Sequence, residues 1–367
     1  MGNRRHCAIV LTARMKPITK FTSIGGQAVI EGVMMRSPNF MAVAVRKPNQ
    51  RIMIRYLPYT SIVQRNRFFR QPILRGIATL IESMFQGIDA LSYSANVAAV
   101  DEGGVGGPKP ELSTGAIIFS ILSAFVLGMG LFVALPHFLT AVVTSRSGSN
   151  ITAQSPWFHL LDGALKISIL LAYVYGIAMM KDIHRVFQYH GAEHKSIYTF
   201  EAGEELIVEN ARKYTTLHPR CGTSFLLFLV IISIGVFSFV FPYFQLTELS
   251  PNVILNHTFM VMIKIGLMLP VAGLSYEFIK MCACRMNNPL FKMMIWPGMI
   301  LQKLTTREPS DDQLEVALAS LRQVLRLEKG SPLNAPQAGS QVEDELEIGQ
   351  LAELGRIQAT VGEFPEV

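Results

Sequence analysis

The sequence has few charged residues and few cysteines for its length. Only 16% of its 367 residues are charged, half are apolar, and the mean hydropathy is +0.33. An ordinary soluble domain carries about 25% charged residues, so this composition excludes that class. Four cysteines in so long a chain do not form a disulfide framework. We expect no secretory signal peptide, because the apolar stretch 7–13 is short and is followed by more basic residues.

Two segments could be taken for nucleotide or nucleic-acid sites, and neither fits. Residues 25–36 hold three glycines but match neither G-x-x-x-x-G-K-[ST] nor G-x-G-x-x-G, so they predict a closely packed backbone turn. Residues 64–75 mix arginines with two phenylalanines. Beside a membrane this pattern places arginine on lipid phosphates rather than on RNA. We therefore expect Arg65, Arg67 and Arg70 to bind anionic lipid, and we expect no nucleic-acid partner.

Four apolar runs are long enough to cross a hydrocarbon core of about 30 Å. They lie near residues 116–139, 160–181, 223–246 and 258–281. The second run carries Asp162 and Lys166, which as an i, i+4 pair can meet at the interface. The fourth carries Lys264, whose side chain we expect to extend to the membrane surface. It also carries Glu277, which lies near the cytoplasmic end of the run and can pair with Arg285 or Arg75. Ionisable residues inside a membrane are candidates for function.

Basic residues are distributed unevenly between the segments that flank these runs. Residues 36–75 contain nine basic residues and no acidic one, whereas residues 247–257 contain no basic residue. Segments rich in Lys and Arg stay in the cytoplasm. The sequence therefore predicts a multi-pass protein of the bacterial cytoplasmic (inner) membrane with both termini cytoplasmic.

The overall pattern predicts a mostly α membrane protein with about four transmembrane helices, a small cytoplasmic β element and interfacial helices. Residues 41–47 and 51–57 alternate as two strands around Pro48-Asn49, and residues 73–98 form an amphipathic helix. The predicted regions are a mobile N-terminal extension (1–20), a β element with an amphipathic helix (21–100), a membrane domain (101–283), an interfacial segment with a soluble helix (284–328) and a disordered acidic tail (329–367).

A polar stretch, 184–222, separates the second and third apolar runs and holds four of the eight histidines. Its centre, His190-Gly191-Ala192-Glu193-His194, has the H-x-x-E-H form of the inverted zincin motif. Because residues four apart share a helix face, His190 and His194 can direct two imidazoles at one metal ion. Glu193 lies beside them as a candidate general base.

Three more residues are candidate metal ligands in this stretch. Glu201 returns to about the same helix face as His194, and His218 and Cys221 stand three positions apart. A thiolate ligand favours a closed structural site, whereas two histidines and a glutamate favour catalysis, and the sequence leaves this choice open. Arg220 is a candidate for stabilising an oxyanion, as is Lys195. The alternative is a polar helix face whose histidines hydrogen-bond at the membrane surface.

Four motifs, GGQAVIEGVMMRSP, YHGAEHKSIYTFEAGEELIVEN, HPRCGTSFL and WPGMILQKLTTREP, resemble the YqhQ-like family of bacterial membrane proteins over residues 21–327. This family is classed as a domain of unknown function and labelled a metal-dependent enzyme. The resemblance implies an integral membrane protein with a cytoplasmic His/Glu/Cys region and supplies no substrate. The candidates carried over by motif are His190, Glu193, His194, Glu201, His218 and Cys221.

We therefore expect a metal-dependent membrane protein that binds Zn²⁺ at a site on the cytoplasmic face. Its activity would be that of a hydrolase acting on a peptide or lipid substrate, with Glu193 as the base. The alternative is a non-enzymatic scaffold whose structural metal joins the polar stretch to the β element. Its partners would be anionic lipid and, through the acidic tail, another protein. A transporter that uses Lys264 and Glu277 is a third hypothesis.

Overall fold

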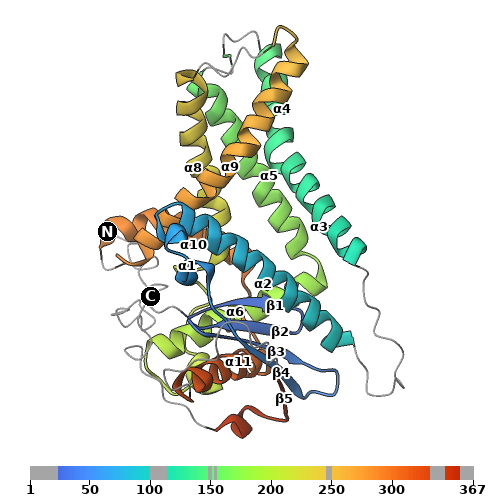
Figure 1. The fold of residues 1–367 in the computed structure, drawn as a ribbon, viewed down its shortest axis with the longest axis vertical. Coiled ribbons are helices and arrows are strands. Elements are labelled where there is room, and N and C mark those ends of the chain that lie inside the picture. Colours follow the sequence, from blue (N-terminus) through green and yellow to red (C-terminus); the bar gives the residue numbers. More distant parts are fainter. Residues whose placement is uncertain are drawn as a thin grey trace, which may run out of the picture.

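The computed structural model describes residues 24–99, 114–147, 151–152, 155–244, 250–286, 288–330 and 344–355. These residues form two parts, a bundle of long apolar helices and a smaller part built on a β-sheet (Figure 1). The predicted N-terminal extension, 1–20, lies outside the described residues. The prediction of a mostly α protein with a small β element is confirmed.

The sheet has five antiparallel strands in the order β1-β2-β3-β4-β5. Their bounds are Gly25–Val29, Gly32–Arg36, Phe40–Arg46, Ile52–Pro58 and Asp344–Ile348. The glycine-rich segment forms β1 and β2, joined by a two-residue turn in which Glu31 has a φ of 51°. Gly32 allows this close packing, because a Cβ atom there would stand 2.2 Å from the Ala44 carbonyl oxygen. The turn predicted at this segment is therefore the tip of a hairpin.

The strand β5 corrects the prediction that residues 329–367 are disordered. Residues 344–348 pair with β4, and the 3₁₀ helix η3 (Leu351–Leu354) follows. The sequence of β5 is acidic, whereas β4 and the turn before it are basic, so Glu347 lies 3.1 Å from Lys47. Ile348 enters the apolar core beneath the sheet. Local composition predicted disorder because both stabilising contacts come from residues almost 300 positions away. The rest of the tail lies outside the described residues.

Helices cover both faces of the sheet. On one face, α6 (Lys181–Glu201) and α11 (Asp311–Gly330) bury an apolar core with β2, β3 and β4. On the other face, α2 (Leu74–Ala99) packs through Ala90 against Met34, Val43 and Val45. This long helix also contacts α9, so it lies between the sheet and the bundle (Figure 1). The amphipathic pattern of residues 73–98 reflects the contacts of α2 with the sheet on one side and with α9 of the bundle on another.

Four helical segments are long and apolar enough to cross a membrane, as predicted. They are Leu122–Arg146, Pro156–Ala178 (α5), Gly222–Tyr243 (α8) and Val253–Ala283 (α9). The first joins α3 (Thr114–Met129) to α4 (Leu135–Arg146) through a π-helical turn, η2 (Gly130–Ala134). Because Pro136 cannot donate a backbone hydrogen bond, the hydrogen bonds of the helix change from the α-helical to the π-helical pattern at this turn.

Three ionisable residues of the bundle, Asp162, Lys166 and Lys264, are buried in its interior. The expectation that Lys264 extends to the membrane surface is wrong, because its side chain is fully buried and lies 2.6 Å from Asp162. Asp162 and Lys166 form the expected i, i+4 pair at 2.9 Å, also in the interior. Burial of a lysine in an apolar bundle requires such a partner. Glu277 pairs with Arg75 of α2.

Shorter helices lie where the bundle meets the sheet. One is α10 (Pro289–Thr305), which packs against α8 and α9. The others are α1 (Ile62–Arg65) and η1 (Arg67–Arg70), whereas α7 (Val208–Ala211) packs against α6 and α11. Several large apolar side chains on α2 and α10 remain exposed, among them Phe85 and Trp296. These helices therefore have the amphipathic character expected of interfacial segments.

Candidate metal centre

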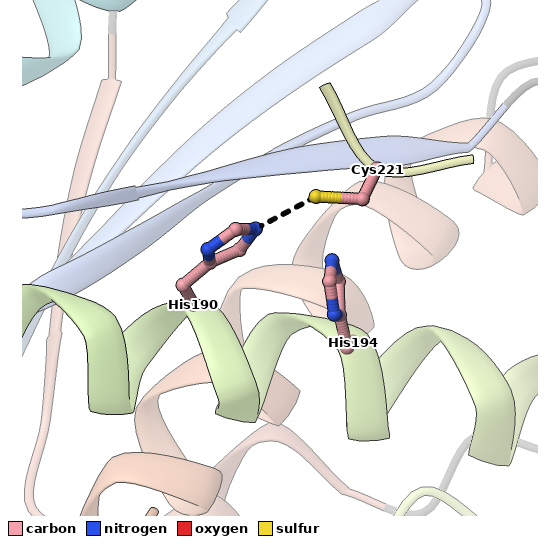
Figure 2. A group of neighbouring side chains, drawn as sticks. All are labelled: His190, His194 and Cys221. Carbon is pink, nitrogen blue, oxygen red and sulfur yellow. Dashed lines mark hydrogen bonds between the residues drawn. The ribbon is translucent and has the colours of Figure 1, made fainter. Parts of the chain in front are cut away.

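The helix α6 and the start of α8 bring His190, His194 and Cys221 together. One potential ligand atom from each residue lies within 4.8 Å of the others. Figure 2 shows both imidazoles rising from the same face of α6 toward the Cys221 sulfur, and His190 Nε2 lies 3.1 Å from that sulfur. The i, i+4 spacing of the histidines places them on that face. Among the described residues, the structure thus joins three of the five predicted ligands.

Both histidine rings are oriented by backbone carbonyl groups. The Nδ1 atom of His190 lies 2.9 Å from the Thr305 carbonyl oxygen, and the Nδ1 atom of His194 contacts the Thr216 carbonyl oxygen. Because a carbonyl oxygen only accepts hydrogen bonds, each Nδ1 must carry the proton. Each Nε2 atom is then left with a lone pair that points toward Cys221. A carbonyl partner of this kind commonly fixes the ring of a metal-binding histidine.

Among the residues that the structure describes, the buried Nε2 atom of His194 has no hydrogen-bond partner. A buried polar atom without a partner is costly, and here it faces the His190 nitrogen and the Cys221 sulfur. In a tetrahedral zinc site the ligand atoms stand about 3.3 to 3.6 Å apart, so small side-chain rotations suffice to bind an ion. The residues present therefore fit a metal. Burial lowers the pKa of His194, although the charge of Cys221 opposes this shift, so the ring stays neutral and able to bind.

Cys221 is held at the N-terminus of α8. Its sulfur accepts a hydrogen bond from the Thr223 backbone N–H at 3.4 Å and also lies 3.1 Å from the Thr223 hydroxyl. The N-terminus of a helix attracts negative charge, which is the state of a cysteine that binds metal. Cys221 is thus positioned as a ligand by the same turn that starts a membrane helix.

Glu193 lies beside the two histidines. One oxygen of its carboxylate, Oε2, is 3.5 Å from His194 Nε2 and 4.0 Å from His190 Nε2. Burial raises the pKa of Glu193, while His190, His218 and a hydrogen bond from the Gly26 backbone oppose this shift. A carboxyl group with a raised pKa, next to a metal centre, is suited to moving protons. The glycine at position 26 allows this approach, since a Cβ atom there would stand 2.7 Å from Glu193 Cγ.

Glu201 and His218 form a separate pair next to this group. The Nε2 atom of His218 lies 3.5 Å from Glu201, and Arg220 forms an ion pair with the same carboxylate. The Arg220 backbone N–H donates to His218 Nδ1, so Nε2 carries the ring proton in the neutral form. Burial lowers the pKa of His218 to about 4. The role of Glu201 and His218 as metal ligands stays a prediction.

The remaining sequence candidates have partners or positions outside the group of three ligands. Lys195 pairs with Glu308. Arg75 donates to Glu277 at 3.1 Å near the junction of α2 and α9. The lipid-binding candidates are on α1 and η1, where their side chains are exposed: Arg65, Arg67 and Arg70. None of these residues contributes to the group of His190, His194 and Cys221.

Sequence reasoning missed the residues that support the ligands. Gln302 is fully buried in α10 and hydrogen-bonds to both the N–H and the carbonyl group of His218, each at 2.8 Å. Thr305, on the same helix, positions His190. Gly191 allows α6 to approach the chain after α10, because a Cβ atom there would stand 2.1 Å from the Arg307 carbonyl oxygen. In the sequence, the only sign that these supporting residues matter was that they lie within the motifs YHGAEHKS and WPGMILQKLTTREP.

Comparison with known proteins identifies the family of the chain. Residues 71–327 match the family described as protein of unknown function (DUF1385). The chain belongs to this family. The match spans α2, the membrane-spanning helices and α11, and it includes all three residues of the candidate metal centre.

A relative from Bacillus subtilis (strain 168) supports the same assignment. It is the uncharacterized protein YqhQ, 34% identical over 317 residues, which cover 84% of this chain and 94% of that protein. No solved structure shows a significant match to the chain. The predicted resemblance to a YqhQ-like family is confirmed.

Proposed function

We propose that this protein is a zinc-dependent hydrolase of the bacterial inner membrane, with its site at the cytoplasmic face. The observation that carries the proposal is the buried Nε2 atom of His194, which has no hydrogen-bond partner in the described part of the chain and faces His190 Nε2 and Cys221 Sγ. Two nitrogen atoms and one sulfur atom are ligands that zinc prefers. Three protein ligands leave a fourth position open, as in catalytic zinc sites.

Each residue of the site has a distinct role in this proposal. His190, His194 and Cys221 hold the ion, and Thr305 and Thr216 orient the two rings through their carbonyl groups. A bound zinc ion would act as a Lewis acid and would lower the pKa of a coordinated water molecule. Glu193 accepts the proton of the attacking water and passes it to the leaving group.

The location of the site bears on its substrate. The ligands lie where α10 ends and α8 begins, at the junction between the membrane-spanning bundle and the sheet (Figure 1). The exposed apolar side chains of α2 and α10 are suited to the membrane interface, with Phe85 and Trp296 as examples. A peptide bond or lipid ester near that interface fits this position, and the uneven distribution of basic residues supports cytoplasmic termini.

Metal content tests the site directly. We would purify the protein in mild detergent without chelators, offer zinc back and measure bound metal by mass spectrometry. We expect about one zinc per chain in the unchanged protein and its loss in the double variant His190→Ala/His194→Ala. The matched control is His184→Ala, which removes an exposed imidazole from the same helix and should keep the metal. Equal metal in all three proteins, or none in any, would refute the proposed centre.

The reaction is tested by Glu193→Gln. This change keeps the size of the side chain but removes its ability to accept a proton. We expect the variant to retain zinc and to lose hydrolysis of the peptides and lipid esters that the unchanged protein cleaves. Loss of zinc together with activity would make Glu193 a ligand. Full activity in the variant would exclude it as the base.

A non-enzymatic scaffold is the second candidate, and the position of Cys221 favours it. This residue is buried at the first turn of α8, so a metal there would join α6 to the bundle, as closed structural sites do. In that case Cys221→Ala would lower the melting temperature in detergent along with the metal content, whereas Glu193→Gln would change neither. The exposed Arg65 and Arg67 would then bind anionic lipid, and the end of the acidic tail would bind a protein partner.

A further inference from the structure

Five ionisable side chains form one hydrogen-bonded chain inside the bundle, far from the metal centre. We name this group the intramembrane chain; its members are Lys166, Asp162, Lys264, His137 and His257. Both ammonium groups donate to the same Asp162 oxygen, Lys264 at 2.6 Å and Lys166 at 2.9 Å. Lys264 also lies 3.0 Å from His137 Nδ1, and His137 Nε2 lies 3.0 Å from His257 Nδ1.

The surroundings of the intramembrane chain are apolar and aromatic. Its residues come from α4, α5 and α9, and Lys264 lies 5.5 Å from the ring centre of Phe237 and 5.7 Å from that of Phe158. Among the described elements packed against it, α8 faces it with aromatic and aliphatic side chains and η2 carries no ionisable residue. His159 of α5, packed between Phe158 and Phe241, is the further titratable group in this region.

The hydrogen bonds of this chain have a defined direction. An ammonium group can only donate, so His137 Nδ1 accepts from Lys264 and the ring proton of His137 is on Nε2. That proton is donated to His257 Nδ1, which places the ring proton of His257 on its own Nε2. His257 is only partly buried and lies near the start of α9, at the end of the bundle farthest from the sheet (Figure 1).

The charges of the group are unbalanced when both lysines are protonated. Two ammonium groups face one carboxylate, and one oxygen of that carboxylate, Oδ1, has no hydrogen-bond partner among the side chains that the structure describes. An excess charge in a membrane interior is costly. Release of one proton from Lys264 would leave Lys166 and Asp162 as a balanced ion pair.

We propose that the intramembrane chain is a proton-exchange site, through which Lys264 releases and rebinds one proton at the end of the bundle opposite the sheet. The Lys264 ammonium gives a proton to His137 Nδ1, His137 gives its Nε2 proton to His257 Nδ1, and His257 gives its Nε2 proton to water. Lys264 becomes an amine, and both rings end in the other neutral tautomer. The reverse sequence restores the ammonium group.

Proton exchange occurs at one end only. Beyond Lys166, the rest of α5 carries no ionisable residue that is buried among those described. Toward the sheet, the next charged pair on α9 is Glu277 with Arg75. The intramembrane chain therefore binds a proton from one side of the membrane and does not conduct it across.

Nitrogen NMR of lysine side chains tests this site. The protein would be labelled with ¹⁵N-lysine and placed in lipid nanodiscs, and the Lys264 Nζ signal would be assigned with Lys264→Arg. As the pH rises, we expect this signal to move from the ammonium to the amine position. The Lys166 signal is the internal control, because its contact is to Asp162 rather than to the histidines, and it should stay at the ammonium position.

The route is tested by His137→Phe, which keeps an aromatic ring and removes both nitrogen atoms. We expect loss of fast hydrogen–deuterium exchange at Lys264 Nζ and no change at Lys166. If this variant does not fold, His257→Phe breaks the next link at a less buried position. A Lys264 signal that stays at the ammonium position at every pH would overturn the proposal. So would exchange at Lys264 that is equally fast in the histidine variants, and the group would then be a permanent ion network.

Discussion

The Nε2 atom of His190 lies 3.1 Å from the Sγ atom of Cys221, although the two residues stand 31 positions apart in the chain. One belongs to a helix of the sheet-containing part and the other to the first turn of a membrane-spanning helix. A metal bound between them would couple the two parts of the protein. Because it would bind only the folded state, zinc should raise the melting temperature.

Replacing Gly26 by alanine should disturb the site from the side of the sheet. The new Cβ atom would stand 2.7 Å from Glu193 Cγ and 2.8 Å from the Met34 carbonyl oxygen. Such overpacking costs about 1 to 3 kcal/mol. We expect a lower melting temperature and weaker zinc binding, measured by competition with a chelating dye. The control is Gly25→Ala, where no atom of the described residues lies within 4 Å of the new Cβ atom, and equal behaviour of the two variants would contradict the packing described.

Gln302→Leu should loosen the segment that carries His218 and Cys221. The change keeps the volume of the side chain but leaves the N–H and the carbonyl group of His218 without their buried partner. Each unsatisfied buried group costs about 1 to 3 kcal/mol. We expect a clear fall in melting temperature and in zinc content. Lys303→Ala, at the exposed neighbouring position, should change neither, and a stable Gln302→Leu protein with full zinc would argue against this role.

The stability of the metal-free protein should fall as the pH drops below neutrality. His218 has a pKa of about 4 in the folded state, because burial disfavours the charged ring, and about 6.5 when unfolded. Between these values the unfolded chain binds the extra proton. The contribution of His218 is therefore fully present above about pH 6.5 and is lost as the pH falls through 4, by about 3 kcal/mol in total.

The test compares unfolding in the presence of a chelator for the unchanged protein and His218→Asn. The variant should show a flatter dependence of stability on pH. Glu193, whose pKa burial raises and the charge of His218 lowers, acts in the opposite direction, so the difference between the curves reports His218 together with its effect on Glu193. Parallel curves would mean that the ring is not buried in its neutral form.

Burial, more than charge, should hold β5 in the sheet. Ile348 is buried in the core beneath the sheet, and Ile348→Ala should cost about 2 to 5 kcal/mol. Glu347 pairs with Lys47 and Arg51 at a partly exposed position, so Glu347→Gln should cost less than about 1 kcal/mol. The melting temperatures of the two variants in detergent would show which change destabilises the protein more. A larger effect from Glu347→Gln would show that charge pairing dominates.

The elements that follow from local pattern could be predicted from the sequence. The four apolar helices depend on length and composition, and the strands β3 and β4 depend on alternation around a turn, so each was found close to its observed place. The pair His190 and His194 follows from helical spacing. Cys221 could be named as a candidate, but its place beside these rings depends on where α8 begins relative to α6.

The features that could not be predicted from the sequence depend on contacts between residues that are distant along the chain. Ile348 and Glu347 find their partners in β4 and in the turn before it, so the acidic composition of their segment predicted disorder instead. Lys264 was expected at the membrane surface because its partner Asp162 is on another helix, and a fourth-span lysine alone gives no sign of that pairing. The support that Gln302 gives to His218 has no local pattern at all.

The sheet is divided along the chain, because β4 ends at Pro58 and β5 begins at Asp344. A ribosome therefore makes every membrane-spanning helix before it makes the last strand and the helix α11 that covers β2 and β3. At ordinary rates of synthesis this interval lasts on the order of tens of seconds. During that time the edge of β4 and the part of the apolar face that α11 covers are exposed, so a chaperone or a protease can bind them before the C-terminal segment is made.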